Sequence, residues 1–326
     1  MKIAHVSLVT PRKCGLYETA RELAYGLRQL GHDARFVDPV PKKTMLAVGE
    51  IDRGVPISDM EWGCEADVLI NHSGYDKTPL EKTNQPIIHV AHGRPLSSFL
   101  SERNGSTPIY SYAIQRSGYA RFKAVVTFWP EYEPYLEKLW APKKVFTVSS
   151  PVDLNYWSPG KSDYNFAGLG GKVNVVMADP WSRVDVSPLP CLHAFLLFAD
   201  KVEGAKLHLF ALDGNMKGIT ALTHRMNGTL GVRQGWAADL RSVYRSADLL
   251  ITPHKIYTRS IREALACDLP VVSGRECDPE DIRAFALHMY AAIRPRSYPK
   301  YRNLACNRFD ISRTAREFDA VLREAL

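Results

Sequence analysis

The chain alternates short hydrophobic runs with longer amphipathic stretches, which is typical of a parallel sheet whose strands are joined by helices. In the first half, hydrophobic runs predict strands over residues 3–9, 34–37, 67–71, 87–90 and 124–128. Between the first two, the stretch Tyr17–Leu30 places Leu23 and Leu27 on one helical face, and Gly31 ends the helix. This alternation predicts a doubly wound α/β domain with helices on both faces of the sheet.

The second half repeats the pattern. Strands are predicted over residues 173–177, 206–211, 249–251 and 271–272, and a helix over 191–198. Between the last two strands, Ser260 and Glu263 have the spacing of a capping box at the start of a helix. The intervening Ser158–Gly171 carries Gly, Ser and Asp with little periodicity, which favours a hinge between two domains.

A helix that begins at the carboxyl end of a parallel strand is a favoured place for a bound anion. The amide N–H groups of its first turn and the helix dipole both point at the ligand. The segment Ser246–Gly274 has this strand, loop, helix and strand order. We therefore expect a phosphate-bearing ligand at this turn.

Composition fits a two-domain protein of the cell interior. The 326 residues and a hydrophobic content of 45% are enough for two cores. No apolar run reaches membrane-spanning length, and the N-terminus reads as a strand and not as a signal peptide. The six cysteines lack CxxC spacing and are expected to be reduced thiols, so we expect a cytoplasmic location. The net charge of +7 favours polyanionic partners: nucleic acid, an anionic membrane face or phosphorylated substrates.

The stretches Glu263-Ala264-Leu265-Ala266 and Pro270-Val271-Val272 resemble a known signature. They are similar to the donor-site segment of nucleotide-sugar-dependent glycosyltransferases of the GT-B fold, chiefly the retaining family 4. Gly235–Asp248 resembles the approach to that segment. The resemblance implies that Glu263 hydrogen-bonds the ribose hydroxyls of the nucleotide. A helix-capping glutamate in an ordinary α/β domain is the alternative.

The first half resembles the acceptor domain of the same family. Pro11-x-x-Cys-Gly15-Leu-x-Glu18 is similar to its first glycine-bearing loop, and the resemblance implies that Gly15 lies against the donor diphosphate or the acceptor. His92-Gly93-Arg94 resembles a strand-end His-Gly whose histidine sits near the transferred sugar. We predict His92 as the catalytic residue, with Arg94 and His72 as acceptor-side or secondary candidates. A turn role for Gly15 and a structural role for each histidine stay open.

The donor loop departs from the family pattern. The usual sugar-binding glutamate, eight positions before Glu263, is Lys255 here, and Tyr257-Thr258-Arg259 replaces Gly-Phe-Gly. Lys255 and Arg259 are therefore predicted to contact the diphosphate, together with Thr258 and Ser260 at the turn. Arg183 is the predicted pyrophosphate cation of the loop after the strand 173–177. Solvated loop cations are the alternative for these basic residues.

The resemblance implies a GT-B fold, in which two Rossmann-like doubly wound domains face each other across a cleft. The expected acceptor domain covers residues 1–155, joined by a C-terminal helix at about 305–326 that crosses back. The expected donor domain covers residues 156–304. Lys144–Trp157 resembles the connector between them.

The function predicted from these features is glycosyl transfer from a nucleotide sugar, such as UDP-glucose, to an acceptor hydroxyl. The resemblance implies retention of anomeric configuration, with a phosphate oxygen taking the acceptor proton. Neither a metal nor a further cofactor is expected, because no Asp-x-Asp motif or zinc ligand set appears.

The acceptor stays open between glycan, lipid-linked, small-molecule and DNA substrates, and peripheral contact with a membrane is compatible with the basic charge. Basic and aromatic residues interleave at Arg294–Arg302 and at Tyr110–Lys123, which can pair phosphate contacts with base stacking. A viral type of enzyme that glycosylates hydroxymethylated DNA bases is one alternative. A non-catalytic GT-B protein that binds nucleotide sugar is another, and a GT-B sugar-nucleotide epimerase fits the Glu263 helix poorly.

Overall fold

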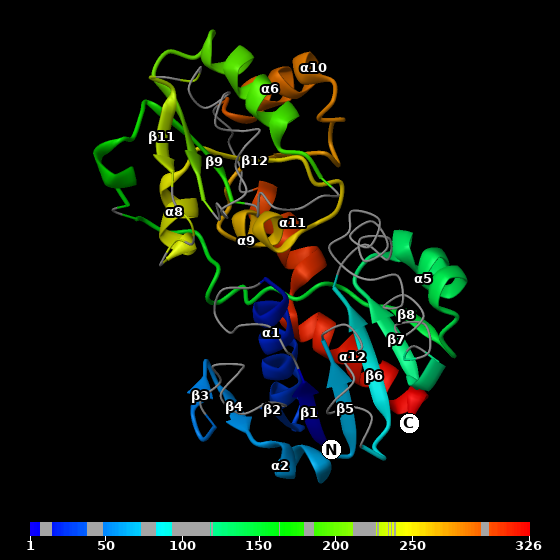
Figure 1. Ribbon diagram of the computed structural model, residues 1–326. Coiled ribbons are helices and arrows are strands. Elements are labelled where there is room, and N and C mark those ends of the chain that lie inside the picture. The colour runs from blue at the N-terminus through cyan, green and yellow to red at the C-terminus, as the bar shows by residue number, and fades with distance from the viewer. Residues whose placement is uncertain are drawn as a thin grey trace. The chain divides into compact units, whose positions relative to one another are not determined.

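The computed structural model divides the chain into two compact units (Figure 1). The first comprises Met1–Asp153 together with Arg308–Leu326, and the second comprises Leu154–Asn307. The residues that the structure describes are 1–6, 15–37, 48–72, 83–92, 118, 120–162, 164–178, 186–210, 226, 228–233, 235, 237, 239–294 and 300–326.

The first unit is built on one sheet of eight strands. They are β1 (Lys2–Val6), β2 (Asp33–Val37), β3 (Ile51–Asp52), β4 (Val55–Ser58), β5 (Val68–Asn71), β6 (Ile87–Ala91), β7 (Ala124–Thr127) and β8 (Val145–Thr147). Their order is β3-β4-β2-β1-β5-β6-β7-β8, and all neighbours are parallel except β3 and β4. The chain builds outward on one side of β1 and then, from β5, on the other. The strand order therefore reverses between β1 and β5, the position where doubly wound sheets bind ligands.

The two faces of this sheet differ in polarity. Side chains alternate along each strand, so neighbours in sequence point to opposite faces. One face carries a core of aliphatic and aromatic side chains, among them Ala4, Val6 and Leu69. The opposite face carries His5 and Phe36, which are aligned across β1 and β2. The helix α1 (Gly15–Gln29) covers this second face, because its Tyr17 ring stacks on Phe36 at 4.8 Å.

The last helix of the chain, α12 (Ile311–Ala325), returns to the first unit and packs on α1. A Cβ atom at Gly26 would lie 2.9 Å from the Cβ of Ala315, so only glycine allows the two helices this close approach. His32 Nε2 lies 2.9 Å from Asp319 Oδ1 and fixes the far end of the contact. The unit also contains α2 (Met60–Cys64), η2 (Pro130–Tyr132) and α5 (Glu133–Trp140).

The second unit has a fully parallel sheet of five strands. They are β9 (Val173–Met177), β10 (Ala205–Leu209), β11 (Leu230–Arg233), β12 (Leu249–Thr252) and β13 (Val271–Ser273). Their order, β11-β10-β9-β12-β13, corresponds to 3-2-1-4-5 and reverses between β9 and β12. Its helices are η3 (Phe166–Gly168), α6 (Leu189–Ala199), α8 (Leu240–Ser246), α9 (Arg259–Ala266), α10 (Ile282–Ala292) and α11 (Lys300–Phe309), the last of which runs on into the first unit.

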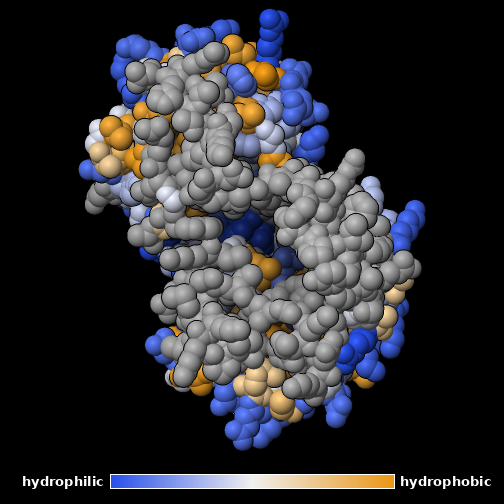
Figure 2. All heavy atoms as spheres, in the orientation of Figure 1, coloured by the Kyte–Doolittle hydropathy of each residue, from blue (hydrophilic) through white to orange (hydrophobic). Residues whose placement is uncertain are grey.

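The hydrophobic core of the second unit lies under α6 and α10. Phe195 and Phe198 of α6 pack with Phe285 and Met289 of α10 against the buried side chains of the sheet. Over these two helices the surface view also shows hydrophobic residues among hydrophilic ones (Figure 2). Leu197 of α6 and Leu287 of α10 are exposed, and such scattered exposure of hydrophobic residues is ordinary for a protein surface.

Two expectations from the sequence are wrong in this region. The segment Ser158–Gly171, expected as a hinge, is held to the second unit. Arg245 Nε donates to the Ser158 carbonyl at 2.7 Å, and the buried Phe166 ring stacks on His208 at 4.0 Å. The predicted connector begins too early, because Val145–Thr147 forms β8 at the edge of the first sheet. The β-branched and aromatic residues Val145, Phe146 and Thr147 favour a strand.

Arg302 on α11 ties three parts of the second unit together. Its guanidinium donates to the carbonyls of Trp157, Ala266 and Leu154 at 2.6, 2.7 and 2.9 Å. Ala266 is the last residue of α9, so the cation also lies at the negative end of that helix dipole. Arg302 belongs to the basic and aromatic run 294–302, but its charge is used inside the fold.

Replacing Arg302 with alanine should therefore destabilise the second unit by about 2–4 kcal/mol, because three carbonyls lose a charged donor. Urea unfolding followed by tryptophan fluorescence measures the change. Arg283→Ala, at an exposed arginine on α10, is the matched control and should shift stability by less than about 0.5 kcal/mol. Equal stability of the two variants would contradict a stabilising role for the three hydrogen bonds of Arg302.

Candidate functional site

In the second unit, the polar loop after β12 leads directly into α9. The strand ends at Thr252, and the buried Pro253 and His254 follow it. Gly274, just after β13, approaches this loop so closely that a Cβ atom there would lie 2.5 Å from the Pro253 carbonyl oxygen. The glycine lets the carboxyl ends of β12 and β13 come together and places the loop at the edge of the sheet.

The helix α9 begins two residues earlier than its sequence suggests. The N-cap is Thr258, with φ −60° and ψ 170°, so the capping box predicted from Ser260 and Glu263 is wrong. The Thr258 side chain accepts no capping hydrogen bond, and its Oγ1 lies 2.9 Å from Ser260 Oγ. The first turn of an α-helix has N–H groups with no acceptor inside the helix, and this end of α9 lacks a side-chain cap. The turn is therefore suited to an anion.

Glu263 and Arg259 contact each other along the buried side of α9. Their Nε and Oε1 atoms are 2.5 Å apart, and the two side chains are only 10% and 5% exposed. A buried carboxylate of this kind needs a cationic partner, which explains why Glu263 does not reach back to cap the helix. The structure thus brings together two of the residues predicted from sequence to bind the donor.

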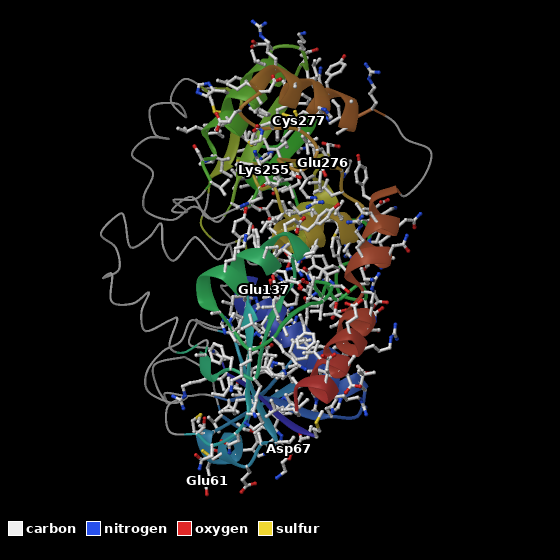
Figure 3. The ribbon with its side chains drawn as sticks, turned by 90° about the vertical axis from the view of Figure 1, so that its right-hand side faces the viewer. Glu61, Asp67, Glu137, Lys255, Glu276 and Cys277 are labelled. Atoms are coloured by element: carbon white, nitrogen blue, oxygen red, sulfur yellow. The ribbon has the colours of Figure 1, made fainter. Side chains whose placement is uncertain are left out.

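The remaining predicted residues of this loop are more exposed. Lys255 lies 3.6 Å from Asp278 with half of its side chain in solvent, an ion pair that contributes little to stability. Lys255 and Glu276, on the loops that follow β12 and β13, are both labelled in Figure 3. The Arg275 guanidinium covers the Tyr257 ring at 4.1 Å. A basic and aromatic rim therefore borders the α9 turn.

In the first unit, three histidines form a chain of hydrogen bonds at the carboxyl edge of the sheet. His5 Nδ1 lies 2.9 Å from His72 Nε2, and His72 Nδ1 lies 2.8 Å from His92 Nε2. His5 is in β1, His72 follows β5 and His92 follows β6, so the chain crosses the reversal of strand order. The Phe128 ring meets His92 edge-on at 5.5 Å. The structure thus places His72 and His92, predicted separately, in one cluster.

Burial keeps the inner histidines neutral. Desolvation lowers the pKa of His5 to about 3 and holds the pKa of His72 well below its usual value. On the opposite face, His89 of β6 stacks on Phe122 and lies 3.2 Å from Asn71 Nδ2, and burial lowers its pKa to about 3.

The other predicted residues are distributed as follows. Gly15 is exposed and begins α1, which covers the face of the sheet that carries the three histidines. Arg94 and Arg183 lie outside the described residues. Sequence analysis missed His5, although a histidine inside an apolar strand is a signal of a buried polar role. It also missed His254, a buried polar residue directly after β12.

No protein-family model and no curated protein matches this chain. Solved structures do. HepE from Anabaena, in complex with UDP and glucose, aligns over 99% of both chains with a TM-score of 0.71 and 12% identity. The fold is GT-B.

Two further GT-B structures extend the comparison. WaaG, a glycosyltransferase involved in lipopolysaccharide biosynthesis, aligns over 96% of this chain and 95% of its own, with a TM-score of 0.63 and 11% identity. An α-glucosyltransferase in complex with UDP-glucose and DNA containing an abasic site aligns over 98% and 99%, with a TM-score of 0.61 and 11% identity. The fold class predicted from sequence, α/β with two doubly wound parallel sheets, is confirmed.

Within the described residues, His, Cys, Asp and Glu side chains do not gather into a group that could hold a metal ion. None of the described helices is long and apolar enough to cross a membrane.

The buried histidines predict a loss of stability in mild acid. Their pKa values are lower in the folded state than in the unfolded chain, so the unfolded state binds more protons. Stability is then fully present above about pH 6.5 and falls as the pH drops toward 3. Each such histidine should steepen the dependence by up to about 1.4 kcal/mol per pH unit. Urea unfolding between pH 7.5 and 5 measures this slope.

The variant His89→Asn tests one contributor. Asparagine keeps an acceptor near Asn71 but does not titrate, so the slope should become shallower by about one proton. His193→Asn, at an exposed histidine of α6, is the control and should leave the slope unchanged. An unchanged slope in His89→Asn would show that His89 takes up its proton equally in both states.

Proposed function

We propose that the protein is a glycosyltransferase that moves a sugar from a nucleotide sugar to an acceptor hydroxyl. The observation that carries this proposal is the whole-chain likeness to HepE, a GT-B structure solved with UDP and glucose. It is supported by the α9 turn, which lies at the carboxyl edge of the second sheet and has no side-chain cap at Thr258. A fold can host many activities, and the residues of the two sheet edges support this one.

The second unit is the proposed donor-binding unit. The amides of the first turn of α9 and the Thr258 and Ser260 hydroxyls are suited to the diphosphate of the donor. Glu263 is proposed to accept hydrogen bonds from the ribose hydroxyls. Arg259 lies 2.5 Å from Glu263 and therefore orients that carboxylate while adding positive charge near the phosphates. Lys255 is a further, exposed source of positive charge.

The proposed reaction breaks the bond between the anomeric carbon and a diphosphate oxygen. The acceptor oxygen forms the new bond to that carbon, and the acceptor proton passes to the leaving phosphate oxygen. Configuration is retained when attack comes from the face that the leaving group vacates. Helix amides and arginine stabilise the negative charge that accumulates on the phosphate, without a metal ion in this scheme. The nucleotide sugar is a co-substrate, and no further cofactor is proposed.

The first unit is proposed to act on the sugar and the acceptor. His92 is partly exposed at the carboxyl edge of the sheet, next to buried His72. An imidazole there can orient a sugar hydroxyl. Gly15, at the start of α1, offers a backbone that a ligand can approach closely.

Donor binding is tested by calorimetry with a panel of nucleotide sugars, UDP-glucose first. Glu263→Gln should weaken binding about tenfold, because a neutral amide accepts weaker hydrogen bonds than a carboxylate. Glu280→Gln, at an exposed glutamate of the same unit, should bind like the wild type. Thermal unfolding of both variants separates lost contacts from lost stability, since Glu263 also partners Arg259.

The outcomes of this panel are distinct. Nucleotide release in the presence of the right donor supports a transferase, even when water is the acceptor. Tight binding without release across acceptors supports a non-catalytic binding protein, and conversion of the donor sugar without any acceptor supports an epimerase. Failure to bind every nucleotide and nucleotide sugar in the panel overturns the proposal.

DNA is one candidate acceptor. The net charge of +7 and the likeness to an α-glucosyltransferase solved with DNA favour it. Arg121 and Lys123 are exposed cations of the basic stretch 110–123, whereas Arg302 of the other basic run is engaged with carbonyls.

If the protein binds duplex DNA, affinity should fall steeply with salt, and replacing Arg121 and Lys123 together with serine should reduce the slope of log K against log salt by about 1.8. Fluorescence anisotropy with a labelled duplex measures both. Absence of binding in low salt removes DNA and leaves glycan, lipid-linked and small-molecule acceptors.

A further inference from the structure

The three histidines share one face of the first sheet because of strand register. His5 of β1 is aligned with Ile70 of β5, and Ile70 is aligned with Ile88 of β6. His72 lies two residues after Ile70, and His92 lies four residues after Ile88. Since side chains alternate along a strand, even steps keep all three imidazoles on the same face. The chain is therefore a product of the sheet itself and not of a variable loop.

The middle imidazole makes the chain directional. A neutral imidazole has one N–H donor and one acceptor nitrogen. His72 is fully buried, and it uses both nitrogens, Nε2 toward His5 and Nδ1 toward His92. If it donates to His92 it must accept from His5, and the reverse arrangement inverts both bonds. Only these two arrangements satisfy both contacts with neutral rings.

The inner end of the chain decides between the two arrangements. His5 is 0% exposed, and among the described residues its Nε2 has no hydrogen-bond partner. The reverse arrangement would place a proton on that nitrogen and bury an N–H without an acceptor. The forward arrangement places only a lone pair there, and orphaned donors are the rarer of the two in folded proteins. The forward arrangement has its protons on Nδ1 of all three rings.

We propose that His5 and His72 are positioning residues that hold His92 in the tautomer with its proton on Nδ1, so that His92 acts as a hydrogen-bond donor. This inference rests on the proposed function, in which His92 meets the sugar or the acceptor. The donor's target is then an oxygen atom of the carbohydrate. His92 Nε2 is occupied by the His72 N–H, so His92 orients its ligand and does not remove the acceptor proton.

Burial supports this assignment. Desolvation of His5 and His72 keeps both rings neutral near pH 7, which the two-bond argument requires. The ring planes of His5 and His72 are only 13° apart and their centroids are 5.1 Å apart, the nearly coplanar arrangement that an in-plane hydrogen bond between them requires. The edge of the Phe128 ring packs against His92 at 5.5 Å.

The direct test is nitrogen NMR of the ligand-free protein labelled with ¹⁵N at histidine. The variants His5→Asn, His72→Asn and His92→Asn assign the three rings by loss of signal. We expect protonated Nδ1 and unprotonated Nε2 in all three, with through-hydrogen-bond coupling between neighbouring rings. Protonated Nε2 in His92 of the wild type overturns the proposal, whatever the protein's activity.

A matched pair of variants tests the role of His5. His5→Leu removes the donor at the inner end, so His92 should show a mixture of tautomers, and the turnover number should fall about tenfold with the KM for the donor unchanged. His5→Asn keeps an N–H near the position of Nδ1 and should restore most of the turnover and the single tautomer. His193→Leu, at an exposed histidine of α6, is the control and should match the wild type.

The proposed function and the proposed tautomer of His92 are contradicted by different results. If the wild-type protein shows the expected tautomers but does not bind a nucleotide sugar, the proposed function is wrong and the tautomer assignment of the three histidines stands. Normal transfer in His5→Leu, or equal loss in His5→Leu and His5→Asn, shows that His5 only fills space. Thermal unfolding of each variant identifies a loss of activity that comes from misfolding.

Discussion

Parallel strand pairing is the constraint on which both halves of this protein depend. When neighbouring strands run in one direction, each delivers the residue after its last hydrogen bond to the same edge of the sheet. The backbone N–H of His72 still donates to the Val6 carbonyl, one residue beyond β5, and so places its imidazole beside that of β1. In the second sheet the close approach of Gly274 to Pro253 gathers the loops after β13 and β12 in the same way.

The two edges use different chemistry because one carries a buried ion pair and the other carries hydrogen-bonded histidines. Arg259 and Glu263 keep a little exposure and can remain charged because they face each other. At the histidine edge, burial keeps the imidazoles of His5 and His72 neutral. A charged edge suits a diphosphate, whereas a neutral edge suits the hydroxyl groups of a sugar, which gain nothing from a full charge.

The sequence predicts the strands and most helices because buried parallel strands are uninterrupted apolar runs, as in Val173–Met177. Prediction from the sequence is wrong where one local pattern is compatible with two structures. Ser260 and Glu263 have the spacing of a capping box, yet Arg259 captures the carboxylate and Thr258 becomes the N-cap. His5 was overlooked because a single histidine in a strand acquires meaning only through register with β5 and β6. Register is a long-range property that periodicity along one segment does not contain.

The chain of three hydrogen-bonded histidines is also consistent with the scheme proposed for the transfer step. If a phosphate oxygen of the leaving group takes the acceptor proton, the first unit needs no general base. A histidine whose tautomer is not fixed would present a proton-accepting nitrogen to the ligand for part of the time. An N–H fixed in place by His72 and His5 can orient an oxygen atom without competing for the proton. Replacing His5 by a carboxylate would reverse the direction of both hydrogen bonds. An acceptor at the inner end would draw the His72 proton to Nε2, and the His92 proton would then lie on Nε2. His5 is fully buried and far from His92 in the sequence, yet through His72 it sets which nitrogen of His92 can donate a hydrogen bond.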